Sequence, residues 1–146
     1  MTTARDIMHA GVTCVGENET LQHAAQTMRD QDIGALPICG DDDRLHGIIT
    51  DRDIVVKCLA AGGDPATMTA GELAQGTPYT VDVSADVDQV LQTMEEHRIH
   101  RVPVLEEHRV VGMIAEADLA RHLPEQRVGE FVELVCAEMT GPSRAS

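Results

Sequence analysis

The chain has 146 residues, of which 42% are hydrophobic, and its formal net charge is −14. This length fits one compact domain or two small domains that share a core, and the aliphatic content is sufficient for a packed interior. The negative charge would repel a phosphate backbone, and the aromatic residues Tyr79 and Phe131 provide no stacking platform for single-stranded nucleic acid. The composition therefore argues against binding to DNA or RNA.

Targeting and membrane signals are not found in the sequence. Residues 1–9 are short and polar and lack the apolar core of a signal peptide. No stretch approaches the roughly 18 apolar residues of a membrane span. We therefore expect a cytoplasmic protein that makes no contact with a membrane.

The first half of the chain predicts a short helical turn over Ala4–Met8 and a β-strand over Val12–Val15. An amphipathic helix follows from Thr20 to about Gln31, and Thr20 has the side chain expected of an N-cap. One face of this helix is apolar and should face the core, and it consists of Leu21, Ala24, Ala25 and Met28.

A β-hairpin and a second helix follow. The first strand contains Ala35, Leu36, Pro37 and Ile38, and the proline indicates an edge or an interrupted strand with unpaired backbone groups. After a polar turn, the return strand covers Leu45–Ile49 and the second helix about Arg52–Ala61.

The return strand turns directly into this helix through Gly47-Ile48-Ile49-Thr50-Asp51-Arg52-Asp53. Thr50 and Asp53 are three residues apart, as in a capping box, in which each side chain accepts a backbone N–H at the helix start. A free helix start also favours anionic or polyhydroxylated ligands. The heptapeptide therefore supports either a helix cap or half of a small-molecule site.

The chain contains an internal repeat. At a shift of 66 residues, Gln26-Thr27-Met28 meets Gln92-Thr93-Met94, and after the hairpin turn a shift of 65 aligns Asp53 with Asp118. The second half therefore predicts the same order of elements. These are a helical turn over Ala70–Ala74, a strand over Tyr79–Val83, a helix from Asp86 to about His97, strands at Arg101–Val104 and Val110–Ile114, and a helix over Ala117–Leu123.

The repeat defines the predicted domains. Gly62-Gly63-Asp64-Pro65 is typical of a linker, so we predict half-domains over residues 1–65 and 66–124, and a C-terminal amphipathic helix and tail over 125–146. That helix should run from Gln126 to Met139 and either pack on its own core or dock on a partner. Its apolar stripe consists of Val128, Phe131, Val132, Val135 and Met139.

A β-α-β-β-α unit that occurs twice, with Pro37 and Pro103 in its strands and a Gly-x-x-Thr-x-x-Asp turn ending at Asp53, resembles the CBS domain family. A tandem pair of CBS domains forms one Bateman module, and the resemblance covers about Ala4 to Leu123. The aliphatic composition is similar to that of actinobacterial stand-alone CBS pairs of the hypoxic-response type. The resemblance implies an α/β (α+β) fold, two half-domains packed sheet to sheet with pseudo-twofold symmetry, clefts between them, and modules that pair as homodimers.

The resemblance also implies a regulatory sensor of adenosine-containing ligands, such as AMP, ADP, ATP or S-adenosylmethionine. Carried over by position, Asp53 would accept the ribose hydroxyls, and Thr50 with the helix start would hold phosphate. Backbone around the remaining positions would line the adenine end of the site, namely Thr13, Ala35, Leu36 and Pro37.

The second copy departs from this pattern. Ala115 stands where the first copy has Thr50, although Asp118 keeps the carboxylate. We expect the second cleft to bind adenylate more weakly or not at all. For Asp118 we favour a structural role, and it stays a ligand-binding candidate of this cleft as the alternative. Arg101 and His100 would lend this cleft positive charge.

One pair of cysteines and one pair of histidines suggest a disulfide and a metal site. In the CBS fold the strands that carry Cys14 and Cys39 should be neighbours, so the two residues form either a disulfide or two buried thiols. His97 and His122 should end two neighbouring helices at the dimer face. A symmetric dimer would then gather imidazoles suited to zinc, and the alternative is that both histidines face water.

Two functions follow from these observations. The first is a non-catalytic regulatory CBS pair that binds an adenine-containing ligand and signals to an effector protein. The second is a structural stress-response homodimer with degenerate clefts, held by metal or disulfide and acting through protein contacts. Serine-hydrolase, zinc-protease and nucleotide-binding loop motifs do not occur in the sequence, so we assign no catalytic residues.

Overall fold

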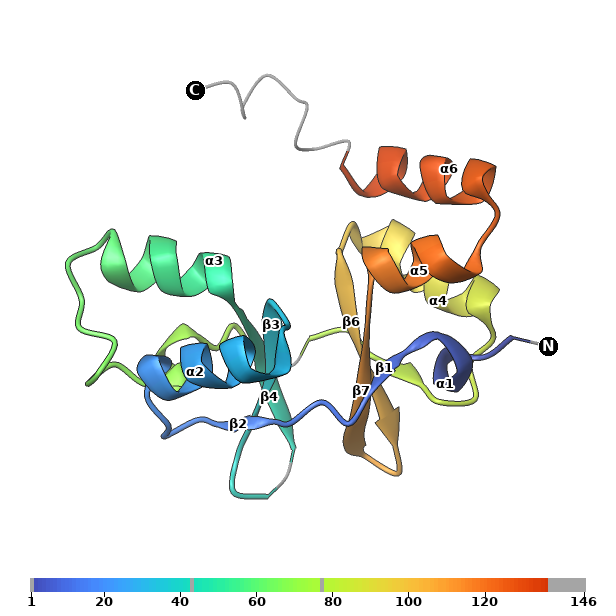
Figure 1. Cartoon of the computed structure of the whole chain (residues 1–146). Coiled ribbons are helices and arrows are strands. Elements are labelled where there is room, and N and C mark those ends of the chain that lie inside the picture. The colour runs from blue at the N-terminus through green and yellow to red at the C-terminus, as the bar shows by residue number, and fades with distance from the viewer. Residues whose placement is uncertain (1, 43, 77, 137–146) are drawn as a thin grey trace. The chain divides into compact units, whose positions relative to one another are not determined.

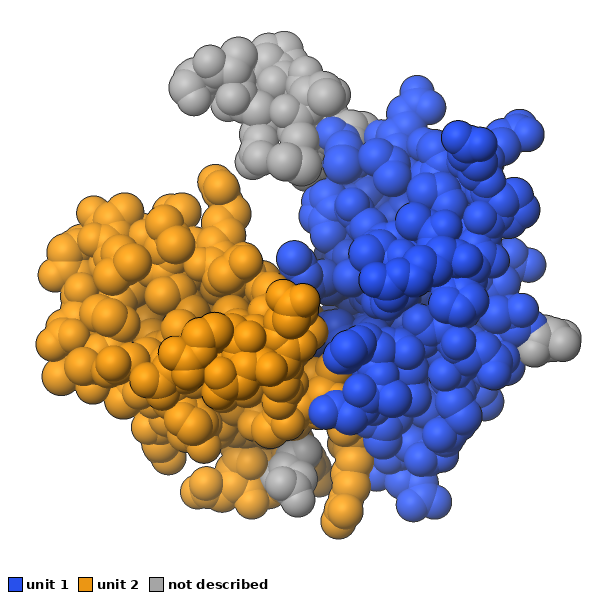
Figure 2. Space-filling model, viewed as in Figure 1, with its two compact units in different colours: residues 1–11, 79–107, 111–146 blue, residues 12–78, 108–110 orange. Residues whose placement is uncertain are grey.

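The structure is a computed structural model that describes residues 2–42, 44–76 and 78–136 (Figure 1). Its helices and strands are divided between two compact units (Figure 2). Unit 1 comprises residues 1–11, 79–107 and 111–146, and unit 2 comprises residues 12–78 and 108–110. These units differ from the sequence repeats, because residues 1–11 pack with the second repeat. The half-domain boundaries 1–65 and 66–124 stay a prediction about the duplication.

Unit 2 contains the first hairpin and its helices. Its sheet has the strand order β2-β3-β4, in which β2 is parallel and β4 antiparallel to β3. The elements are β2 (Val15–Gly16), α2 (Leu21–Gln31), β3 (Ala35–Cys39), β4 (Leu45–Thr50), α3 (Asp51–Asp53), the π-helix η1 (Ile54–Leu59) and the 3₁₀-helix η2 (Ala70–Leu73).

Pro37 lies in β3, the middle strand of this sheet. Its missing N–H nevertheless removes no hydrogen bond between β3 and β2. The pairing of β2 with β3 is confined to Val15 with Ile38 and Gly16 with Cys39, which leaves the Pro37 position outside it. On the other side Pro37 is opposite Ile48 of β4. The strand therefore has the interrupted pairing that a proline requires.

Unit 1 has a sheet of order β1-β7-β6-β5. The β6–β7 turn, Glu107–His108, has both residues at positive φ (50° and 71°), as in the two-residue turns that match the twist of a hairpin. The elements are α1 (Ala4–Ile7), β1 (His9–Ala10), β5 (Val81–Asp82), α4 (Val87–His97), β6 (Arg101–Glu106), β7 (Arg109–Ala115), α5 (Glu116–His122) and α6 (Glu125–Val135).

Strand β1 brings the N-terminus of the chain into the sheet of the second repeat. His9 pairs with Met113 and Ala10 with Gly112. The pairing depends on glycine, because a Cβ at Gly112 would lie 2.5 Å from the Met8 sulfur and 3.0 Å from the His9 carbonyl oxygen. In sequence this segment belongs to the first predicted half-domain, and no strand was predicted there.

The two long helices of the repeat begin and end in the same way. Thr20 caps α2 by accepting the His23 N–H, and Asp86 caps α4 by accepting the Gln89 N–H, as predicted. Each helix ends in a left-handed residue, Asp32 or Arg98. The predicted apolar face of α2 is buried except at Ala25, which is exposed, so the prediction for Ala25 was wrong.

Other local predictions also need correction. The helix predicted over Arg52–Ala61 is a single turn, α3, that continues as the π-helix η1. The first strand is shorter than predicted, because only Val15 and Gly16 pair with β3. The hairpin strands and the helical turns at α1 and η2 are within one or two residues of prediction.

Helix α6 packs on α4 and α5 of its own unit, which confirms the first of the two alternatives for the C-terminal helix. Phe131 is fully buried and Val135 is 2% exposed, whereas Val132 is exposed at 37%. Arg127 forms an ion pair with Glu95 of α4. Met139 of the predicted stripe lies outside the described residues.

Within the described ranges, the structure contains no helix long and apolar enough to cross a membrane.

Candidate functional site

The turn from β4 into α3 is a reciprocal cap. The Thr50 hydroxyl oxygen accepts the backbone N–H of Asp53 at 3.1 Å, and a carboxylate oxygen of Asp53 accepts the N–H of Thr50 at 3.0 Å. The capping interpretation of the heptapeptide is therefore confirmed. It leaves open the second interpretation, because a cap occupies only part of the polar surface of the two side chains.

The second carboxylate oxygen of Asp53 makes a weaker contact. Its nearest cation is the Lys57 amino group at 3.5 Å, and the Asp53 side chain is 19% exposed. Among the residues that the structure describes, no backbone N–H donates to this oxygen. It is the acceptor that Asp53 can offer to a ligand without breaking the cap.

The β3–β4 ladder places the other candidates of the first half. Ala35 is directly opposite Thr50, and Leu36 is opposite Ile49, so the start of β3 and the helix cap are neighbours. Ala35, Leu36 and Pro37 are buried, and only their backbone could serve a ligand. The Thr13 hydroxyl accepts a hydrogen bond from the Gln31 amide at 2.9 Å.

The corresponding cap of the second half keeps only one of the two hydrogen bonds. An Asp118 carboxylate oxygen accepts the Ala115 N–H at 2.8 Å, and the other lies 3.3 Å from the Arg121 guanidinium. Asp118 is only 8% exposed. Both oxygens have partners within unit 1, in keeping with the structural role expected of Asp118, and its ligand-binding role stays a prediction.

A cavity of about 380 Å³ lies beside this second cap and is lined by His100, Arg101, Ala115, Glu116 and Ala117. The His100 ring nitrogen Nδ1 contacts a Glu116 carboxylate oxygen. His100 therefore has a carboxylate partner, and Arg101 is the other cation predicted for this cleft. Cys136 lies in the same neighbourhood. Cys136 follows the end of α6 and is partly exposed, whereas the other free cysteine, Cys58, is buried.

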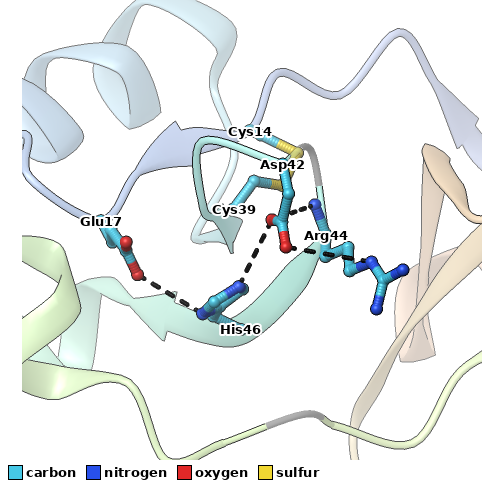
Figure 3. Close-up of polar contacts among 6 residues, drawn as sticks. All are labelled: Cys14, Glu17, Cys39, Asp42, Arg44 and His46. Atoms are coloured by element: carbon cyan, nitrogen blue, oxygen red, sulfur yellow. Dashed lines mark hydrogen bonds and ion pairs between the residues drawn. A yellow bond between two sulfur atoms is a disulfide. The ribbon is translucent and has the colours of Figure 1, made fainter.

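Cys14 and Cys39 form a disulfide in unit 2 (Figure 3). Their Cα atoms are 5.8 Å apart, within the range that a disulfide spans, and 25 residues separate them in sequence. The neighbouring pair Gly16–Cys39 of the β2–β3 ladder holds the two segments side by side. The strand neighbourhood predicted for these cysteines is confirmed.

A chain of polar contacts runs from Glu17 through His46 and Asp42 to Arg44 in the same unit (Figure 3). His46 lies between Glu17 and Asp42, with nitrogen–oxygen distances of 3.4 and 3.6 Å. Asp42 also accepts the backbone N–H of Arg44 at 3.0 Å, which lowers the pKa of the Asp42 carboxyl group. These contacts join the β3–β4 turn to the segment after β2.

The two histidines predicted to bind zinc are exposed and oriented by neighbours. The His97 ring stacks on Tyr79 with a centroid separation of 3.5 Å. His122 places Nδ1 2.9 Å from the Asp118 carbonyl oxygen, which leaves its Nε2 available. Among the described residues, the group of potential metal ligands that comes together is His100, Glu116 and Cys136, and it includes neither histidine.

Comparison with known proteins decides the family. The CBS domain model matches residues 4–59 and 70–125, which together make up most of the chain. The chain belongs to the CBS domain family. The duplication read from the sequence is therefore a CBS domain pair.

Two relatives extend this result. The CBS domain pair is 66% identical to Hypoxic response protein 1 of Mycobacterium tuberculosis over 139 residues, covering 95% of this chain and 97% of the relative. It is 33% identical to the CBS domain-containing protein YhcV of Bacillus subtilis, covering 82% and 84% of the two chains. The predicted resemblance to hypoxic-response CBS pairs is confirmed.

Solved structures confirm the fold. A crystal structure of Hypoxic Response Protein I with two coordinated zinc ions matches with a TM-score of 0.75 and 69% identity, covering 84% of this chain and all of the other. The CBS domain pair of protein MJ0100, solved with 5′-methylthioadenosine and S-adenosyl-L-methionine, matches with a TM-score of 0.72 and 30% identity, covering 83% and 94%.

Proposed function

We propose that this chain is a non-catalytic regulatory CBS domain pair of the cytoplasm that acts in a stress or hypoxic response. It binds an adenosine-containing ligand beside Thr50 and Asp53 and transmits the bound state to an effector protein. The observation that carries the proposal is the second carboxylate oxygen of Asp53, which takes no part in the cap, contacts Lys57 and belongs to the helix start beside the Ala35–Thr50 pair.

The chemistry of this turn suits a nucleoside. A carboxylate oxygen accepts hydrogen bonds from ribose hydroxyls, and the buried strand start supplies backbone groups for an adenine ring. The Lys57 contact at 3.5 Å is partly exposed, so a ligand displaces it at little cost. The complex of the MJ0100 pair with two adenosine compounds supports this ligand class.

Isothermal titration with AMP, ADP, ATP, S-adenosylmethionine and 5′-methylthioadenosine tests the proposal. Asp53→Asn retains an oxygen that can cap Thr50 but loses the charge, so the affinity should fall by roughly 10- to 100-fold. Asp51→Asn, in the same turn, is the matched control and should bind as the wild type does. If none of the five compounds binds, or if Asp53→Asn binds equally well, the ligand proposal is wrong.

A second candidate function is a structural stress-response homodimer joined by zinc, in which the Cys14–Cys39 disulfide stabilises each chain. The two zinc ions in the structure of Hypoxic Response Protein I favour it. The residues of this chain fit zinc, because the contact of His122 Nδ1 with a carbonyl oxygen leaves Nε2 to coordinate. His97 and His122 from two copies would supply the four nitrogen ligands of a tetrahedral site.

Exposed apolar side chains support self-association. Val55, Val56 and Leu59 on the π-helix η1 are 55%, 46% and 54% exposed. A run of large aliphatic groups of this kind is typical of an interaction surface. A second copy of the chain would bury them through helix contacts of the kind that the family resemblance implies.

Zinc content and molar mass in solution test this second function. His122→Ala should lower the zinc content per chain, whereas the exposed His23→Ala should not. Light scattering before and after chelation then shows whether the dimer depends on the metal. Full zinc content in the His97→Ala/His122→Ala double variant would contradict the assignment.

A further inference from the structure

Three side chains of different chemistry meet in unit 1 without a role in either proposed function. They come from different segments: His100 directly precedes β6, Glu116 is the first residue of α5, and Cys136 directly follows α6. One ligand atom from each lies within 4.8 Å of the other two. All three residues are partly buried.

The contacts around these residues leave their ligand atoms directed at one another. Helix α5 is capped by Asp118, so Glu116 is not needed for that purpose, and its carboxylate contacts the His100 ring instead. The backbone N–H of Cys136 donates to the Val132 carbonyl oxygen at 2.9 Å, which holds the Cys136 backbone at the end of α6. The group is thus positioned by three elements of one compact unit.

An imidazole nitrogen, a carboxylate oxygen and a thiolate sulfur form a ligand set for a borderline divalent ion, of which zinc is the typical one. Bond lengths of about 2.0–2.3 Å place tetrahedral zinc ligands roughly 3.3–3.8 Å apart. The ligand atoms of the group lie within 4.8 Å of one another, so small side-chain shifts would suffice, in which His100 and Glu116 separate to admit the ion. The adjacent cavity of about 380 Å³, which His100 and Glu116 both line, gives access for the ion and for a water as fourth ligand.

The charges agree with this ion. On binding, the Cys136 thiol gives up its proton, and the thiolate and the Glu116 carboxylate together balance the two charges of the ion. Arg101 also lines the cavity, and its positive charge opposes the ion, so the two anionic ligands must outweigh this repulsion.

The group exists only in the second half of the pair. At the shifts that align the repeats, His100 corresponds to Gly34 and Glu116 to Asp51. In the first half these positions form a backbone hydrogen bond, from the Asp51 N–H to the Gly34 carbonyl oxygen at 3.0 Å. Cys136 follows α6, which comes after the second repeat.

We propose that His100, Glu116 and Cys136 form a zinc site within unit 1, separate from His97 and His122. The ion joins the C-terminal end of α6 to the starts of β6 and α5. Its fourth position is open to solvent beside the second cap. In the first half, the equivalent region belongs to the proposed nucleoside site. In the second half, this region binds a metal ion instead.

Protection of the Cys136 thiol from alkylation tests the site directly. The full chain is stripped with a chelator, incubated with iodoacetamide with and without added zinc, and the alkylated cysteines are located by peptide mass spectrometry. Zinc should slow alkylation of Cys136 by at least roughly tenfold. The buried Cys58 is the internal control and should react at the same rate with and without the metal.

Variants separate this site from the other zinc proposal. His100→Ala and Glu116→Gln should abolish the protection of Cys136, while His97→Ala and His122→Ala should leave it intact. Circular dichroism of each variant controls for folding. If zinc does not protect Cys136, or protects it equally in His100→Ala, the site does not exist. Protection that is lost in His122→Ala and kept in His100→Ala would also overturn it.

Discussion

Thr50 and Ala115 occupy the same cap position in the two halves of the pair, with nearly the same backbone. Their φ and ψ angles are −116° and 162° for Thr50 and −121° and 171° for Ala115. In both halves an aspartate three residues later accepts the N–H of the cap residue. The two helix starts therefore differ by one hydroxyl group, which accepts the Asp53 N–H in the first half.

Placing alanine at position 50 and threonine at position 115 should therefore have opposite effects on the free energy of unfolding. Thr50→Ala removes an N-cap acceptor and should lower the free energy of unfolding by about 1 kcal/mol. Ala115→Thr supplies the missing acceptor for the Asp118 N–H and should raise it by up to about 1 kcal/mol, since the adjacent cavity has room for the side chain. Urea denaturation measures both values, and Thr50→Ser should be near wild type. A destabilising Ala115→Thr would show that the two caps are not equivalent.

The elements set by local chemistry could be predicted from the sequence. Thr20 and Asp86 mark helix starts because their side chains accept backbone N–H groups, and that interaction needs no tertiary context. The hairpins follow from hydrophobic strands around polar turns. The Thr50–Asp53 cap is read from two residues at a spacing of three for the same reason.

The features that depend on distant contacts could not be predicted. Strand β1 is a dipeptide, His9–Ala10, with no pattern of its own, and it forms only because Gly112 lets the backbone approach. The π-helix η1 carries no distinct sequence signal. The group of His100, Glu116 and Cys136 joins residues as far as 36 positions apart, and only the packing of α6 brings the cysteine to the other two.

The Cys14–Cys39 disulfide predicts a redox-dependent stability. A cross-link that closes a loop of this length contributes about 3.5 kcal/mol by restricting the unfolded chain. Reduction of the wild type should therefore lower the free energy of unfolding by about that amount. The Cys14→Ala/Cys39→Ala variant should not respond to reductant.

Denaturation with and without a phosphine reductant makes this measurement, and Cys58→Ala is the matched control that should respond as the wild type does. Non-reducing mass spectrometry after alkylation reports the bond itself. Four alkylated thiols in the native protein, one for each cysteine of the chain, would contradict the disulfide in solution.

Substitutions at two neighbouring positions of α6 should differ sharply in their effect on the free energy of unfolding. Phe131 is fully buried against the core of unit 1, and Phe131→Ala should lower the free energy of unfolding by about 3–5 kcal/mol. Val132→Ala changes an exposed side chain and should alter it by less than about 0.5 kcal/mol. Thermal unfolding of both variants tests whether α6 belongs to this core. Equal, small effects would show that the helix is not packed in solution.

In the β3–β4 turn, the Asp42 carboxylate should contribute to the free energy of unfolding at neutral pH and lose this contribution in acid. The backbone N–H of Arg44 donates to the Asp42 carboxylate and holds the pKa of that group below its ordinary value of 3.8. Because the folded-state pKa lies below the unfolded one, the contribution is complete above a pH of about 4 and is lost as the pH falls through the folded-state pKa. Asp42→Asn keeps an acceptor for the Arg44 N–H but does not titrate, so its unfolding free energy should depend less on pH in this range. Carbon-detected NMR of the Asp42 carboxyl group measures the pKa, and titration at or above 3.8 would rule out the hydrogen bond as a stabilising contact.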